Sequence, residues 1–427
     1  MRKPNTRLKK NITYPAKTLL AFLPFLILLI SIIPHTGHAY DTSCWIKWAV
    51  NIRENGFSRT YQSGANYLFV YQYILLIFVK IQGTVENIVA HIHQLKIFTL
   101  LFELGTTLVL FKILNHYWKD TSKAIQYSLY YFLNIAVLYN SLIWGQMDGI
   151  MTFFVFSSLY FAYRKKVFYA LVLFFLAINT KFQSIVFLPL VLLLLLPAIR
   201  EKGFLKKTAV SLVTIILITV LAYAPFILVG DLPLMWKNTF GSTIGHSPFA
   251  SANAYNIWYL LLNQDPYTVS DSTLFGGLTY RMWGILLFAF FSVFALYHFI
   301  KPSIEILFRK KSADFPLNKV IISCALVPLL FFFFNTEMHD RFTHPVLIFL
   351  ALYAFLYKRP LPYLTVSLAY LLNLDAVFKF FQTGLYDTFI YAPGFISCLY
   401  ILSMLLLFTD LYDFRIKSRK SAVKVSS

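Results

Sequence analysis

The sequence has few charged residues, few cysteines and no phosphate-binding loop motif, and these shortages exclude several classes of protein. Only 13% of its 427 residues are charged, against about 25% in a typical soluble domain. The three cysteines, Cys44, Cys324 and Cys398, are far apart and give neither a disulfide framework nor a Cys-x-x-Cys metal pair. No GxxxxGK[ST] phosphate-binding loop is present. A soluble globular domain and a P-loop nucleotide enzyme are therefore not expected.

The sequence is rich in apolar and aromatic residues. Hydrophobic residues make up 58% of the chain and aromatic residues 19%, and the mean hydropathy is +0.65. A disordered chain lacks apolar content, so disorder is excluded as well. No internal repeat or charged block divides the sequence, which predicts one all-α polytopic membrane domain over residues 1–427.

About twelve apolar segments have a length suited to crossing the hydrocarbon core. They are residues 17–34, 95–114, 124–142, 149–163, 167–180, 183–199, 206–229, 281–300, 318–335, 343–357, 361–377 and 391–411. Threading the chain with the basic N-terminus inside places 28 of the 38 Lys and Arg residues inside and 10 outside. The positive-inside rule therefore predicts that both termini, including the basic tail 412–427, are cytoplasmic.

Two long pieces of the chain are then expected outside, at about 35–94 and about 230–280. The apolar stretch 67–81 is short for a span, and counting it as one would reverse the charge bias, so we predict a re-entrant or surface-lying helix there. Residues 1–39 also resemble a secretory signal, and cleavage after Ala39 is an alternative to a first span. The only glycosylation sequon, at Asn11, is expected inside, which favours a bacterial inner membrane.

Ionisable residues near the ends of spans are costly and need a reason. Four charge-bearing turns are all expected at the outer side: one at Asp41, one at Asp148, one at Lys181 and one at 337–342. A purely structural role remains open for each of these residues. Asp41 and Asp148 could cap helices, Trp144 could be an interfacial belt residue, and Lys181 could extend to lipid headgroups.

The position of all four charge-bearing turns at one membrane interface favours chemistry on a lipid-linked substrate. The headgroup of such a substrate lies at the membrane surface and its tail lies in the bilayer. Carboxylates can take a proton from a hydroxyl, and Lys, His and Arg can hold a phosphate leaving group. A transporter would more naturally place polar groups near the midplane, on broken helices.

Four short motifs together resemble a known family. They are Trp-Gly-Gln-Met-Asp-Gly at 144–149, Lys-Phe-Gln at 181–183, Ser-Ala-Asn-Ala-Tyr-Asn-Ile-Trp at 251–258 and Met-His-Asp-Arg-Phe at 338–342. In this order they resemble the GT-C membrane glycosyltransferases, closest to bacterial relatives of the mannosyltransferases of glycolipid-anchor synthesis. The resemblance runs from about residue 20 to residue 350.

The resemblance implies an inverting hexosyltransferase, with mannose favoured, that uses a polyprenyl-phosphate sugar as donor on the extracytoplasmic side. Its acceptor would be the hydroxyl of a lipid, a glycan or a protein. Asp41 would be the catalytic base. Asp148 would be the second catalytic carboxylate, acting as a second proton acceptor, a group that positions the acceptor, or a structural cap. Contacts to the donor phosphate map onto Lys181, His339 and Arg341. The remaining substrate-binding positions are Trp144, Gln146, Gln183, His246, Asn253, Asn256, Trp258 and Asp340.

No cofactor and no nucleic-acid partner is expected. Thr42 and Ser43 follow Asp41 where many relatives carry a second acid, so a divalent metal is not expected either. Two rival functions remain: a lipid-carrier or sugar flippase, and a membrane acyltransferase that would use a paired His and acid, for which His339 and Asp340 are the adjacent candidates.

Overall fold

Helices make up most of the computed structural model, which describes residues 14–241, 245, 247–309 and 314–413. The first half of the chain contains α1 (Tyr14–Ser31), α2 (Ala39–Asn55), η1 (Phe57–Ser63), α3 (Phe69–Gln82), α4 (Val85–Ala90), η2 (Ile92–Gln94), α5 (Leu95–Trp118), α6 (Thr121–Phe132), α7 (Ile135–Leu138), η3 (Tyr139–Trp144), α8 (Asp148–Tyr163), α9 (Val167–Thr180), η4 (Phe182–Phe187), α10 (Leu188–Leu195) and η5 (Leu196–Arg200). The second half contains α11 (Phe204–Leu228), α12 (Leu232–Gly241), α13 (Trp258–Leu261), β1 (Leu274–Phe275), β2 (Leu278–Thr279), α14 (Tyr280–Leu307), α15 (Leu317–Phe334), η6 (Asp340–Thr343), α16 (Val346–Tyr357), α17 (Pro360–Phe378), η7 (Phe389–Tyr391) and α18 (Pro393–Leu411). The predicted all-α class is confirmed, with one two-stranded antiparallel ribbon, β1 and β2, added to it.

Seven helical segments of the described chain are long and apolar enough to cross a membrane by length and composition. They are Ile92–Trp118, Phe182–Arg200, Phe204–Leu228, Tyr280–Leu307, Leu317–Phe334, Pro360–Phe378 and Pro393–Leu411, and each overlaps one of the twelve expected segments. The chain is therefore a helical membrane protein. Of the other expected segments, 149–163, 167–180 and 343–357 form helices of 16, 14 and 12 residues.

One expected segment, 124–142, is broken into three pieces. Helix α6 ends at Phe132, and the side-chain oxygen of Asn134 then accepts a hydrogen bond of 2.9 Å from the backbone N–H of Ala136. An Asn in this position caps a new helix rather than continuing the old one. The short α7 follows and passes into the π-helix η3, which ends at Trp144.

Helices α15 and α16 form the centre of the bundle. In α15, 78% of the apolar stretch is buried inside the protein, and all residues from Val346 to Ala354 of α16 are buried. In contrast, only 11% of the corresponding stretch of α11 and 17% of that of α14 is buried. Side chains on these peripheral helices are apolar and exposed, as expected for helices that face lipid.

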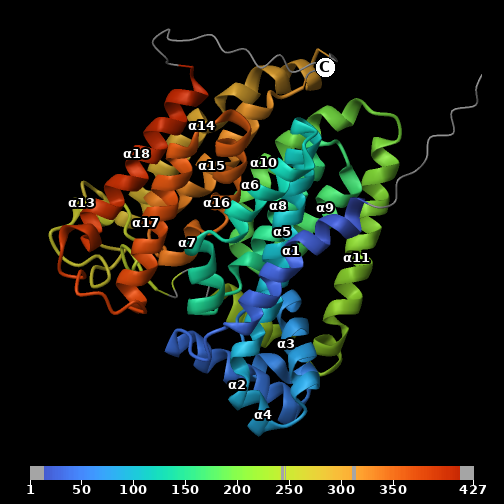
Figure 1. Ribbon diagram of the computed structural model, residues 1–427, viewed down its shortest axis with the longest axis vertical. Helices are drawn as coiled ribbons and strands as arrows, with labels where there is room; N and C mark the ends of the chain where they lie inside the picture. Colours follow the sequence, from blue (N-terminus) through green and yellow to red (C-terminus); the bar gives the residue numbers. More distant parts are fainter. Residues whose placement is uncertain (1–13, 242–244, 246, 310–313, 414–427) are drawn as a thin grey trace, which may run out of the picture.

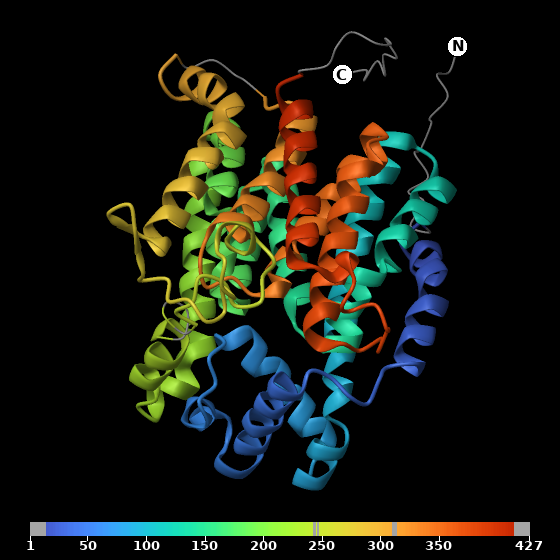
Figure 2. The same ribbon diagram turned by 90° about the vertical axis from the view of Figure 1, so that its left-hand side faces the viewer.

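The two long pieces around 35–94 and 230–280 lie at the same end of the bundle. Helices α2, α3 and α4 lie together at the bottom of Figures 1 and 2, below the longer helices. The side chain of Gln62 donates a hydrogen bond of 3.0 Å to Asp231, and Asn238 donates one of 2.7 Å to the carbonyl of Tyr61. The 14-residue α3 packs against α2 and α9.

At the other end of the bundle, the basic connections between helices contact one another. Lys165, in the turn between α8 and α9, forms an ion pair of 2.8 Å with Asp314, just before α15. Arg200 donates a hydrogen bond of 3.1 Å to the carbonyl of Ile306, near the end of α14. Three connections that the charge bias assigns to one side of the membrane therefore do lie at one end of the bundle.

Candidate functional site

Asp41 lies in the first turn of α2 and is almost fully buried. Its Oδ2 accepts a hydrogen bond of 2.7 Å from the indole N–H of Trp144 and lies 3.0 Å from Nδ1 of His38. The N-cap position belongs to His38, so Asp41 is not a helix cap. The carboxylate is fixed through one oxygen, and Oδ1 has no hydrogen-bond partner among the described residues.

Trp144 is 1% exposed and so is not an interfacial belt residue. Its ring stacks on His38 with 4.5 Å between the ring centroids. Gly145 follows with a φ of 89°, and a Cβ at this position would lie 3.1 Å from Cε of Lys96. The turn thus needs glycine both for its backbone angle and for the close approach of Lys96.

Asp148 and Lys181 form a buried ion pair. Lys181 Nζ lies 2.6 Å from Asp148 Oδ1, and the two side chains are 7% and 2% exposed. Asp148 is the first residue of α8 and Met147 is its N-cap, so Asp148 does not cap the helix. Lys181 also lies 5.0 Å from the ring centroid of Phe342 and does not extend to the surface. The pair brings three of the four predicted turns into contact.

The turn η6, which contains Phe342, also carries Asp340 and Arg341. The Arg341 guanidinium is planar and more rigid than a lysine ammonium. Its NH1 lies 3.7 Å from Asp340 Oδ1. Several buried polar atoms nearby have no hydrogen-bond partner among the described residues: Arg341 Nε, Asp340 Oδ1 and both side-chain polar atoms of Gln146. Buried polar groups are normally bonded, so unpaired ones suggest a partner from outside the chain.

Burial and the nearby positive charge act in opposite directions on the pKa values of Asp41 and Asp340, the two carboxyl groups that lie outside the membrane-spanning helices. Burial alone would raise the pKa of Asp41, but the positive charge of Arg341 and the hydrogen bonds from His38 and Trp144 together hold this pKa well below its usual range. Burial raises the pKa of Asp340 to about 7, although the Arg341 charge opposes the rise. Asp41 is therefore ionised at neutral pH, whereas Asp340 titrates near it.

The predicted residues of the long loop contact the site mainly through the backbone. Asn253 has a φ of 65°, and its carbonyl accepts a hydrogen bond of 2.8 Å from the side chain of Asn373. The backbones of Ala252 and Asn253 pair with His339. This pairing places the loop beside η6.

Asn256 and Trp258 hold the loop onto α15. The Asn256 amide donates hydrogen bonds to the carbonyls of Phe332 and Asn335, and the Trp258 indole donates one of 3.3 Å to Asn335. Gln183 is partly buried in η4, two residues after Lys181. His246 lies outside the described residues.

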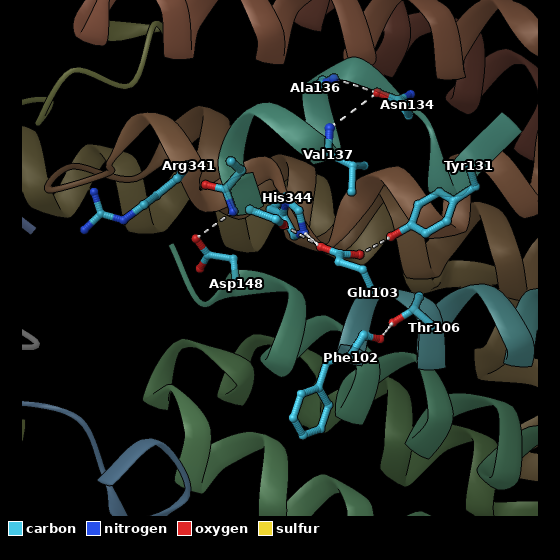
Figure 3. Close-up of polar contacts among 12 residues, drawn as sticks. Phe102, Glu103, Thr106, Tyr131, Asn134, Ala136, Val137, Asp148, Arg341 and His344 are labelled. Carbon is cyan, nitrogen blue, oxygen red and sulfur yellow. Dashed lines mark hydrogen bonds and ion pairs between the residues drawn. The ribbon is translucent and has the colours of Figure 1, made fainter. Parts of the chain in front are cut away.

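A second buried pair, which the sequence analysis did not single out, lies beside this cluster. The Glu103 carboxylate of α5 lies 2.9 Å from Nε2 of His344 and accepts a hydrogen bond from Tyr131 (Figure 3). It accepts another from the hydroxyl of Ser141. Nδ1 of His344 lies 3.3 Å from the Tyr370 hydroxyl. An acid inside an otherwise apolar span is itself a signal, and Glu103 is such an acid.

Asp375, near the end of α17, is another buried carboxylate that the sequence analysis missed. It accepts hydrogen bonds of 2.8 Å from Tyr139, 3.0 Å from Tyr386 and 2.8 Å from Tyr391. These bonds tie η3 and the segment after α17 to the same helix end. Asp375 therefore has a structural role in holding the π-helix that leads to Trp144.

Within the described part of the chain, no three His, Cys, Asp or Glu side chains are grouped so that they could hold a metal ion. A comparison of the chain with known protein families gives no match, and a comparison with curated proteins gives none either.

Proposed function

We propose that the protein is an inverting GT-C-type glycosyltransferase that moves a hexose, mannose by preference, from a polyprenyl-phosphate sugar to an acceptor hydroxyl. In this proposal the chain crosses a bacterial inner membrane about twelve times, with both termini in the cytoplasm and the site on the extracytoplasmic side. The charge bias of the connections supports that orientation.

One observation carries the proposal. Asp41, Asp148, Lys181 and Arg341 come from four distant parts of the sequence, yet they gather in one buried cluster at one end of the helices. Burying such charges is costly, and a fold that needed only stability would do as well with apolar residues. Unpaired polar atoms in the same cluster support a polar substrate there.

Asp41 suits the role of base. Its Oδ2 is held by Trp144 and His38, which leaves Oδ1 to face an acceptor hydroxyl. As the hydroxyl oxygen forms its bond to the anomeric carbon, Oδ1 takes the hydroxyl proton. The bond from the anomeric carbon to the phosphate oxygen breaks, and the polyprenyl phosphate leaves with the electron pair. A single displacement of this kind inverts the anomeric carbon.

Arg341 suits the donor phosphate. Its guanidinium keeps an unpaired Nε and offers the planar fork that matches phosphate oxygens, whereas Lys181 is held by Asp148. Arg341 is also the strongest influence that lowers the pKa of Asp41. A phosphate bound to Arg341 would offset that charge, so the pKa of Asp41 would rise when the donor is in place, making it a better base.

Two observations weigh against the rival functions. The described charges of the cluster lie at one end of the helices, whereas a flippase needs polar groups along its path. The buried pair of Glu103 and His344 does not offer the accessible imidazole that an acyltransferase needs, because both side chains are at most 1% exposed and both ring nitrogens of His344 lie close to polar partners.

The test uses purified protein with synthetic short-chain polyprenyl-phosphate mannose, glucose and arabinose, a membrane-lipid extract as the acceptor source, and the release of polyprenyl phosphate as the readout. We expect release with one sugar. In the Asp41→Asn variant release should fall about 10²–10⁴-fold, the usual contribution of a positioned base, while donor binding is kept.

Glu54→Gln is the matched control, because Glu54 is an exposed acid on the same helix α2 and should leave release unchanged. Equal release by Asp41→Asn and the unaltered protein would refute the role of Asp41. Movement of a fluorescent lipid carrier across proteoliposomes, without any sugar transfer, would replace the proposal by a flippase.

A further inference from the structure

Two adjoining cavities lie at the end of the bundle opposite the buried cluster of Asp41, Asp148, Lys181 and Arg341. They share Tyr163, Arg164 and Leu194 in their walls. Helix α8 runs for 16 residues from Asp148 to Tyr163, so about 24 Å separates this end from the cluster. The cavities are therefore not part of the proposed transferase site.

The inner cavity has a volume of about 60 Å³ and is mostly apolar. Its apolar walls include Phe156, Leu159, Val320, Cys324, Phe349 and Leu352. His116, Tyr117 and Tyr160 also line this cavity, but most of its lining surface is apolar. A water molecule needs about 10–15 Å³ and two to four polar partners, so a mostly apolar surface favours an apolar occupant. The natural content of a cavity like this, in a membrane protein, is hydrocarbon.

The outer cavity, of about 280 Å³, is larger and has a charged rim with Arg164, Lys165 and Asp314. Lys165 is paired with Asp314 at 2.8 Å. Within the described part of the chain, Arg164 forms no side-chain ion pair, and it is exposed at the rim. Two cations and one carboxylate leave one positive charge, which is complementary to a single phosphate anion.

From these features we propose that the two cavities bind one anionic phospholipid of the surrounding leaflet. Its phosphate contacts Arg164 and Lys165, and the end of one acyl chain enters the inner cavity past Leu194. A free phosphate would use the rim alone, and a zwitterionic lipid would bring its own cation to a site that is already positive. The joined apolar and cationic parts therefore select a lipid that has both a chain and a net negative charge.

The experiment measures the binding of labelled phosphatidylglycerol to the full-length protein in nanodiscs of phosphatidylcholine. We expect one saturable site, with phosphatidylcholine binding at least tenfold more weakly. Arg164→Gln should weaken binding by about tenfold to hundredfold, the range for a hydrogen bond to a charged group. Lys202→Gln removes an exposed charge from the same end but lines neither cavity, so it should leave binding unchanged.

A second pair of variants tests the chain path without removing charge. Leu194→Phe narrows the junction of the cavities and should weaken binding, whereas Leu192→Phe, two residues along α10 and 53% exposed, should not. Equal binding of phosphatidylglycerol and phosphatidylcholine would overturn the proposal. So would full competition by inorganic phosphate, or unchanged binding by both Arg164→Gln and Leu194→Phe.

Discussion

Removal of Lys181 should destabilise the protein far more than removal of any exposed lysine. In Lys181→Met an unbranched apolar side chain of similar length replaces the cation, so packing is largely kept. Asp148, which is 1% exposed, then remains buried without the ion pair of 2.6 Å. Its other contact, the amide of Asn140 at 3.4 Å, is long for a hydrogen bond and compensates little.

The size of the effect follows from the burial of both partners. Breaking a buried pair by removing one member typically costs 3–5 kcal/mol, because an uncompensated charge stays inside. The positive charge of Arg341 acts on Asp148 as well, which puts the expected loss near the lower end, at about 3 kcal/mol. The double variant Asp148→Asn with Lys181→Met should recover most of that loss, since it leaves no unpaired charge.

The assay is unfolding in mixed micelles with increasing sodium dodecyl sulfate, followed by tryptophan fluorescence. Lys47→Met is the control, because Lys47 is exposed on α2 at the same end of the molecule, and it should change the free energy of unfolding by less than about 0.5 kcal/mol. If Lys181→Met matched this control, or if the double variant were as unstable as the single one, the cluster would not be buried and paired as described.

Three further variants test the charges around this pair. The Asp41 carboxylate, whose pKa is held low, should stabilise the fold above about pH 4 and lose this effect as the pH falls further, so the stability advantage over Asp41→Asn should shrink on acidification. Burial raises the pKa of Asp340 to about 7, and its ionised form is the unfavourable one, so stability should fall as the pH rises from about 4 to 7. Asp340→Asn should therefore stabilise the protein more at pH 8.5 than at pH 5 in the same unfolding assay. In Gly149→Ala the new Cβ would overlap the Glu103 carboxylate, so a loss of about 1–3 kcal/mol is expected despite the better helix propensity of Ala; an unchanged unfolding midpoint would contradict that close contact.

The sequence by itself determined the class of the protein and the residues that need an explanation. Long apolar segments can satisfy their backbone groups in a membrane only as helices, so composition and segment length were enough to predict an all-α membrane domain. Ionisable residues are rare in such segments, which is why Asp41, Asp148, Lys181 and Arg341 could be singled out without any structure.

Only the tertiary structure decided what these residues contact. Pairing between Lys181 and Asp148, 33 positions apart, depends on how α8 and α9 pack, and no local pattern encodes it. For the same reason Trp144 proved to be a buried partner of Asp41, although an interfacial position fitted its sequence context equally well. The chain break that precedes the π-helix and Trp144 arises because Asn134 caps a new helix, α7, within a segment that is otherwise apolar enough to continue.

Glu103 shows most clearly what cannot be predicted from the sequence, namely the partner of a buried ionisable residue. A lone acid in an apolar span signals a polar role from sequence alone, but its partner, His344, lies 241 positions away and enters the core only through the turn at η6. Side-chain partners at such separations are fixed by the packing of whole helices, because periodicity and propensity act over a few turns. The sequence therefore determined which groups are costly to bury, and the packing of the bundle decided which of them compensate one another.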